Sequence, residues 1–266
     1  MSETLLLQVG ALLFGIIVGS FLNALLFRFN TGRSVTHGRS KCMQCGHTLS
    51  AFDLVPIFSY LWLGGRCRYC GAQISIQYPL VEAAAGLLSL AIYLGHPDPL
   101  VYAFWFVVWM TLLFIVVYDL RHTVIPWSAS LLLLFLAIIS LSFPFLPGSY
   151  IGLPYVFVIP NLWQVIAGPL LALPLFLLSL VSRGRWMGWG DAPLELSLGL
   201  LLGLSMGATA LMLSFWIGAV VSIMLIVFKK GLTMKSEIPF APFLVAGAML
   251  THFLHVDFFN TIPFLW

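Results

Sequence analysis

Charged side chains are scarce in this chain, and their scarcity excludes a soluble globular protein. Asp, Glu, Lys and Arg together make up 8% of the 266 residues, whereas hydrophobic residues make up 61%. Soluble globular domains carry about 25% charged residues. Because no soluble fold could cover so much apolar surface, the composition predicts an integral membrane protein.

Other absences narrow the class further. The first residues lack the basic segment of a cleaved signal peptide, so we expect the first hydrophobic run to remain as a helix. The alternating ten-residue pattern of a membrane β-barrel is also missing, because runs such as residues 131–141 are continuously apolar. No glycine-rich nucleotide loop and no convincing internal repeat is found. Together these absences favour a helical membrane protein.

Eight apolar segments predict an all-α polytopic membrane protein with about eight transmembrane helices, each needing about 20 mostly apolar residues. The segments cover residues 5–27, 79–94, 99–118, 127–143, 162–182, 193–204, 207–228 and 239–254. We place the boundary between the sixth and seventh segments at residues 205–207. The chain then divides into a first transmembrane helix (1–27), a zinc-type cysteine loop (28–78) and a seven-helix membrane core (79–266).

The basic residues predict the orientation of these helices. If the N-terminus is outside, the inner connections hold six, one, two and three Lys or Arg residues, which are all 12 in the chain. These connections are residues 28–78, 119–126, 183–192 and 229–238. Because inner loops of membrane proteins are enriched in Lys and Arg, we expect both termini outside and the cysteine loop in the cytoplasm.

All four cysteines lie in that loop as two Cys-x-x-Cys pairs, Cys42 with Cys45 and Cys67 with Cys70, separated by 21 residues. Two residues between thiolates let one turn bring both sulfurs to a tetrahedral ion. The alternatives are free thiols or two disulfides, and a cytoplasmic location disfavours disulfides. We predict a structural Zn²⁺ site, because four cysteine ligands leave no open coordination position.

Two acids at the ends of apolar segments form a candidate catalytic pair. Asp191 ends the sequence Gly-Trp-Gly-Asp, and Asp119 follows the third apolar segment on the same predicted face. Two carboxyl groups a few ångströms apart can share a proton, so that one activates a water while the other protonates a scissile carbonyl. The alternatives are a helix N-cap for Asp191 and, for Asp119, a surface ion pair with Arg121 or with another basic residue of the inner connections.

Several motifs, in order along the chain, resemble the type IV prepilin peptidases, a family of GxGD-type membrane aspartic peptidases. Asp191 with its preceding residues matches the GxGD motif, and Asp119 with Ile125 and Pro126 resembles the first-aspartate motif of that family. Further resemblance lies in residues 19–23 with Arg28, in the two cysteine pairs, in residues 78–82 and in residues 237–244. The resemblance therefore extends over nearly the whole chain.

This resemblance implies a function. Members cleave the short basic leader of type IV prepilins and type II secretion pseudopilins at the cytoplasmic face of the bacterial inner membrane, which makes Asp119 and Asp191 the expected catalytic residues. Many also methylate the new N-terminus with S-adenosylmethionine, and the resemblance links Asn23 and Glu82 to that activity. The expected partners are prepilins and membrane lipid, without nucleic acid. The alternatives are a peptidase that only uses its zinc loop as a scaffold, and a proton-coupled carrier.

Three positions depart from the family's pattern. Pro193 stands where Lys is common, two residues after the second aspartate. Trp127 follows the Ile-Pro pair where Asp or Asn is common, and Ala241 replaces the glycine of the last motif. Both aspartates are intact, so the departures leave the hydrolytic prediction in place.

Three more polar residues lie in apolar surroundings. Asn23 has the alternative role of a hydrogen bond between helices. Glu82 has the alternative role of a cap at the start of its helix. Glu195, four residues after Asp191, is expected on the same helical face as that aspartate.

Overall fold

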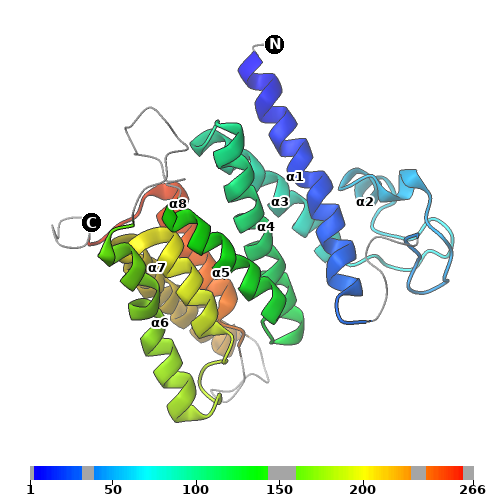
Figure 1. The fold of residues 1–266 in the computed structure, drawn as a ribbon. Helices are drawn as coiled ribbons and strands as arrows, with labels where there is room; N and C mark the ends of the chain where they lie inside the picture. Colours follow the sequence, from blue (N-terminus) through cyan, green and yellow to red (C-terminus); the bar gives the residue numbers. More distant parts are fainter. Residues whose placement is uncertain (1–2, 32–38, 143–159, 229–237, 260–266) are drawn as a thin grey trace. The chain divides into compact units, whose positions relative to one another are not determined.

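The computed structural model describes residues 3–31, 39–142, 160–228 and 238–259, and every structural statement refers to these residues. Within them the fold is all-α, as predicted (Figure 1). The elements are α1 (Glu3–Arg28), η1 (Ala51–Leu54), α2 (Phe58–Trp62), α3 (Gln77–Gly95), α4 (Pro99–His122), α5 (Trp127–Ser142), α6 (Leu162–Ser182), α7 (Asp191–Phe228) and α8 (Ala241–Leu254). Glu237, the first residue of the last motif, lies outside the described residues.

The lengths and compositions of the helices confirm an integral membrane protein. Helices α1, α3, α4, α6 and α7 are long and apolar enough to cross a membrane, and α5 and α8 are shorter apolar helices. The described part of each predicted apolar segment lies in or directly beside one of these seven helices. The predicted sixth and seventh segments both belong to α7.

Helix α7 is broken at Gly203, where φ is 77° and ψ is 179°. A positive φ favours glycine, which has no Cβ to clash with the backbone. After the break, Ser205 donates a hydrogen bond of 2.8 Å to the Asp257 carboxylate, and Thr209 donates one of 3.2 Å. The break therefore lies slightly before the predicted boundary at residues 205–207.

The chain forms two compact units, residues 1–114 and residues 115–266. In the N-terminal unit, α1 packs closely on α3 through small residues. A Cβ atom added at Gly19 would lie 2.8 Å from the Cβ of Ala85 and 2.9 Å from the Cα of Glu82. Gly15, one turn earlier in α1, is similarly crowded. Such small residues let membrane helices approach closely.

In the C-terminal unit, α7 packs against α5, α6 and α8. The contact with α6 is close, because a Cβ atom added at Gly199 would lie 2.9 Å from the Cα of Gly168. Helix α7 is thus the central element of this unit. Its first residue is Asp191.

The cysteine loop contains a short repeat that our sequence analysis missed. Residues 40–49 and 65–74 fold into matching turns, which we call the two knuckles. In each, the N–H of the first cysteine donates to the carbonyl five residues on, at 2.9 Å for Cys42 and 2.8 Å for Cys67. The glycine after each cysteine pair has a φ of 70° or 69°. The two segments share few residues besides these cysteines and glycines, so the repeat is hard to detect by sequence alone.

Candidate functional site

The two predicted catalytic aspartates come together in the C-terminal unit. Asp119 lies in the last turn of α4 and Asp191 opens α7. Both are buried, with 4% and 5% of their surface exposed. The two carboxyl groups are close enough for the charge of Asp119 to act directly on Asp191. A buried carboxyl pair of this kind is the arrangement in which a proton can be shared.

The turn before α7 holds the Asp191 carboxyl group. The Gly188 N–H donates a hydrogen bond of 3.0 Å to Asp191 Oδ2, and a Cβ atom added at Gly188 would lie 3.2 Å from that oxygen. Ser179 Oγ, fully buried in α6, donates a 3.1 Å hydrogen bond to the Gly188 carbonyl. Asp191 is therefore supported by the turn that precedes its helix.

The second glycine of the motif packs against the first-aspartate motif. A Cβ atom added at Gly190 would lie 2.8 Å from the Cβ of Ile125 and 3.2 Å from its Cδ1. Ile125 belongs to the Ile-Pro pair that follows Asp119 in the sequence. The requirement for glycine at position 190 is thus a packing requirement, and this contact keeps the segments after Asp119 and before Asp191 together.

We expect Gly190→Ala to weaken the site without removing either carboxyl group. The new methyl group would push Ile125 away, and overpacking of this kind costs about 1–3 kcal/mol. The variant should melt at a lower temperature and cleave substrate more slowly, as measured by thermal unfolding in detergent and by product mass. Gly10→Ala is the matched control, because a Cβ atom there has nothing within 4 Å. Equal stability of the two variants would contradict this packing argument.

Asp119 is held by the start of α8. The backbone N–H of Ala241 donates a hydrogen bond to its carboxylate. Because only the backbone of Ala241 takes part, the departure from glycine at this position leaves the contact intact. The other carboxylate oxygen, Asp119 Oδ2, is buried and has no hydrogen-bond partner within the described residues. That oxygen is available to a water molecule or a substrate.

Two neighbours of Asp191 on α7 complete the surroundings. Glu195 is 1% exposed, and its Oε1 atom has no hydrogen-bond partner in the part of the chain that the structure describes. Its spacing of four residues places it on the face of Asp191, as predicted. Pro193 lies in the first turn of α7. Because a backbone N–H in the first turn has no acceptor within the helix, a proline there removes no helical hydrogen bond and leaves the helix regular.

The predicted methyl-donor candidates lie together in the N-terminal unit. Asn23 is 1% exposed, and its Nδ2 donates a 3.1 Å hydrogen bond to the Tyr78 carbonyl, so it does connect α1 with α3. Glu82 is 6% exposed and accepts a 2.7 Å hydrogen bond from the Ile57 N–H. It also shares a side-chain hydrogen bond with Ser20 of α1. Glu82 thus anchors the cysteine loop to α3. This role differs from the alternative role of a cap at the start of α3.

The loop is strained where Glu82 holds it. Ile57 has a φ of 61° and a ψ of −51°, and the Phe58 N–H donates a 2.5 Å hydrogen bond to the Pro56 carbonyl. This is a γ-turn with positive φ, a rare conformation for a β-branched residue. Strain of this kind persists only where the surroundings impose it, and it gathers at functional sites.

The four cysteine sulfurs form a cluster suited to a metal ion. All four Sγ atoms lie within 4.8 Å of one another, and those of Cys42 and Cys70 are 3.8 Å apart. A tetrahedral zinc ion with Zn–S bonds of about 2.3 Å requires sulfurs about 3.8 Å apart. Backbone hydrogen bonds from Cys45 and Gln44 lower the pKa of the Cys42 thiol to about 6, which favours the thiolate that binds metal. The donor set therefore fits zinc.

Known proteins match the chain over both units. Residues 13–96 match the bacterial peptidase A24 N-terminal domain, and residues 104–223 match the type IV leader peptidase family. The prepilin leader peptidase/N-methyltransferase of Dichelobacter nodosus is 30% identical over 269 residues, covering 90% of this chain and 88% of that protein. The protein of that name from Bacillus subtilis (strain 168) is 32% identical over 243 residues, covering 90% and 91%. No solved structure matches the chain.

Proposed function

The chain belongs to the type IV leader peptidase family, as its ordered motifs indicated, and on that premise we propose its function. It removes the basic leader from type IV prepilins or type II secretion pseudopilins and then methylates the new N-terminus. The observation that carries this proposal is the buried pair of Asp119 and Asp191, which interact electrostatically and are each held by a backbone N–H.

The proposed hydrolysis needs one proton shared by the two carboxyl groups. The carboxylate member takes a proton from a water molecule, and the resulting hydroxide attacks the scissile carbonyl while the protonated member donates to its oxygen. Ala241 and Gly188 each direct an N–H to one of the two carboxyl groups. These backbone contacts fix the orientation of the acids, and Asp119 Oδ2 stays available for the water.

We place this reaction at the cytoplasmic face of a bacterial inner membrane, with both termini outside. The arrangement of all 12 basic residues in the predicted inner connections supports this orientation. Both aspartates then lie at the inner surface, because Asp119 ends a helix and Asp191 begins one. A substrate whose basic leader remains in the cytoplasm would present its cleavage site at the same level.

Two cofactors belong to the proposal. Zn²⁺ would be held by Cys42, Cys45, Cys67 and Cys70, and would supply the loop with a rigid centre. S-adenosylmethionine would supply the methyl group. Asn23 Oδ1, buried without a hydrogen-bond partner among the described residues, and the Glu82 carboxylate are acceptors suited to its ammonium or hydroxyl groups.

One incubation tests the proposed function. Purified protein is mixed with a prepilin and S-adenosylmethionine, and the product is weighed by mass spectrometry. We expect loss of the leader and gain of one methyl group on the new N-terminal residue. A mature product without the methyl group would support the peptidase-only alternative, and an intact prepilin would contradict the proposal.

We expect Glu82→Leu to reduce methyl transfer while leader cleavage continues. The substitution removes the acceptor of the part-buried Ile57 N–H, and an N–H left without a partner costs about 1–3 kcal/mol when buried, or roughly 5- to 150-fold in an equilibrium. The measurement is the methylated fraction of cleaved product. Ser89→Ala, which removes another buried hydrogen bond from the same helix, is the matched control. Normal methylation by Glu82→Leu would contradict the assignment of Glu82.

A further inference from the structure

One stretch of the cysteine loop exposes an unusual number of large apolar side chains. We call residues 52–62, which include most of η1 and all of α2, the interfacial segment. Its exposed residues are Phe52 (78%), Leu54 (41%), Val55 (39%), Phe58 (58%), Leu61 (70%) and Trp62 (75%). Isolated apolar residues are normal on a protein surface, but a contiguous group of this kind marks an interaction site.

The interfacial segment presents no charge to its surroundings. Its single charged residue is Asp53, whose side chain is only 3% exposed and forms a 2.8 Å ion pair with Arg68. Burial alone would raise the pKa of Asp53, but hydrogen bonds from Ser50 and Tyr69 and the charge of Arg68 lower it, so the acid stays ionised and paired. The exposed face of the segment is therefore apolar and aromatic.

A hydrogen bond to α3 places this segment beside the first turns of that membrane-spanning helix. The Ile57 N–H, directly before α2, bonds to Glu82, which is the sixth residue of α3. At a rise of 1.5 Å per residue, Glu82 lies about 7.5 Å along α3 from Gln77. The start of α2 is thus level with the second turn of α3. Helices that lie in a membrane interface bury their apolar face about 5–10 Å into it.

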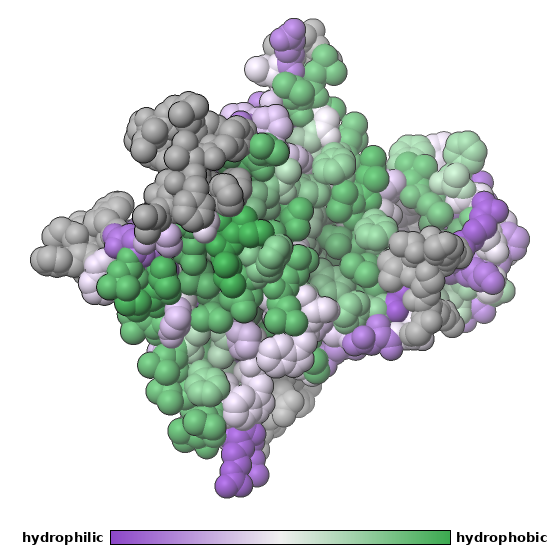
Figure 2. All heavy atoms as spheres, viewed as in Figure 1, coloured by the Kyte–Doolittle hydropathy of each residue, from purple (hydrophilic) through white to green (hydrophobic). Residues whose placement is uncertain are grey.

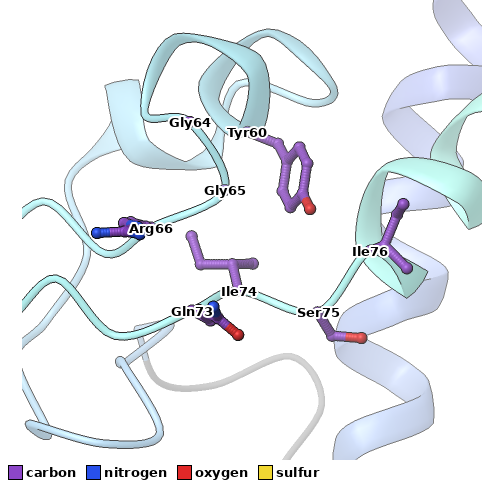
Figure 3. Close-up of a pocket in the computed structure, with 8 residues that line it drawn as sticks. All are labelled: Tyr60, Gly64, Gly65, Arg66, Gln73, Ile74, Ser75 and Ile76. Atoms are coloured by element: carbon purple, nitrogen blue, oxygen red, sulfur yellow. The ribbon is translucent and has the colours of Figure 1, made fainter.

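A cavity lies between α2 and the start of α3. It measures about 610 Å³ and is lined by Tyr60 of α2, by Ile76 directly before α3 and by the second knuckle between them (Figure 3). Ile76 and Leu80 are 63% and 60% exposed, so exposed apolar residues are also present at the start of the membrane-spanning helix.

The two sides of the loop differ in character. Apolar residues gather on the side that carries α2, whereas hydrophilic residues gather on its outer edge (Figure 2; α2 is labelled in Figure 1). Arg39, Lys41 and Arg66 are exposed on or beside the knuckles. Basic residues beside an apolar face are typical of segments that bind anionic lipid surfaces.

We propose that the interfacial segment inserts into the cytoplasmic leaflet at the boundary between headgroups and acyl chains, and that the knuckles bind anionic phospholipid headgroups. The lipid surface is favoured over a substrate segment, because exposed apolar residues are also present at the start of the membrane-spanning helix α3, at Ile76 and Leu80. This anchoring would hold the cysteine loop against the membrane. It depends on the membrane-spanning fold and is independent of the proposed catalytic activity.

The position of Trp62 tests the proposal in the full-length protein. The protein is placed in nanodiscs whose lipids carry bromine, a quencher of tryptophan fluorescence, at a shallow or a deep acyl position. The Trp62 signal is taken as the difference between the wild type and Trp62→Phe. We expect lipids brominated at the shallow position to quench it by about half, since an interfacial side chain lies about 5–10 Å deep. An unquenched Trp62 signal would overturn the proposal.

A pair of matched variants separates specific insertion from a general disturbance. Leu61→Gln places a polar amide in the interfacial segment, whereas Met43→Gln places one at a similarly exposed apolar position (74%) on the first knuckle without adding a negative charge. Only Leu61→Gln should reduce quenching of Trp62. Quenching that appears only after a prepilin is added would contradict insertion of the segment into lipid. Quenching that is the same with and without phosphatidylglycerol would contradict binding of anionic headgroups by the knuckles.

Discussion

Asp119→Asn and Asp191→Asn are each expected to reduce leader cleavage by about 10³-fold, the scale on which general acid or base groups contribute. Asparagine keeps the size of the side chain and can still accept the N–H of Ala241 or Gly188, so the fold should persist. It can neither take a proton from water nor give one to the scissile carbonyl. The measurement is the rate of mature product by mass spectrometry.

Asp257→Asn is the control for these two variants. Asp257 is another acid of the C-terminal unit, but it bonds to Ser205 and Thr209 beyond the break in α7. The break at Gly203 is about 18 Å along the helix from Asp191 at 1.5 Å per residue. Cleavage by this control should stay close to that of the wild type. An equal loss in all three variants would mean that the fold, rather than the chemistry, had been damaged.

Cys42→Ser combined with Cys67→Ser is expected to remove zinc and abolish methyl transfer while leader cleavage continues. Across residues 39–76, all of which the structure describes, Cys67 is the only buried residue. The loop has almost no apolar core, so metal binding must supply its folding free energy. Each substitution also removes one ligand from a different knuckle. Metal analysis and the mass of the product measure both effects in one preparation.

Met43→Ser is the matched control for the cysteine variant. Met43 lies between the first two cysteines and is 74% exposed, so its removal leaves all four sulfurs in place. This control should keep its zinc and its methyl transfer. A cysteine variant with wild-type zinc content would contradict the metal site, and a parallel loss of cleavage would contradict the separation of the two activities.

The fold was largely predictable because membrane helices are determined by long apolar runs. The sequence placed the break in α7 about two residues too late, at residues 205–207 instead of Gly203. That break depends on a positive φ and on hydrogen bonds to Asp257, which is 54 residues later in the chain. Such contacts are formed by tertiary structure and leave no local periodic signal.

The candidate site was predicted only in part. The motifs identified Asp119 and Asp191, but not the backbone N–H of Ala241, because a backbone group has no sequence signature. Ser179 was also missed, although a polar residue within an apolar helix is a usable signal. Its hydrogen bond to the Gly188 carbonyl explains why that position is polar.

The central claim is that Asp119 and Asp191 act as one catalytic pair, and a double-mutant cycle of cleavage rates tests it most directly. Groups that act as a unit are grossly non-additive, so removing the second adds little to the loss caused by the first. We therefore predict that the Asp119→Asn/Asp191→Asn protein cleaves prepilin about as slowly as either single variant. Losses that multiply in the double variant, or a single variant that cleaves at the wild-type rate, would contradict the pair.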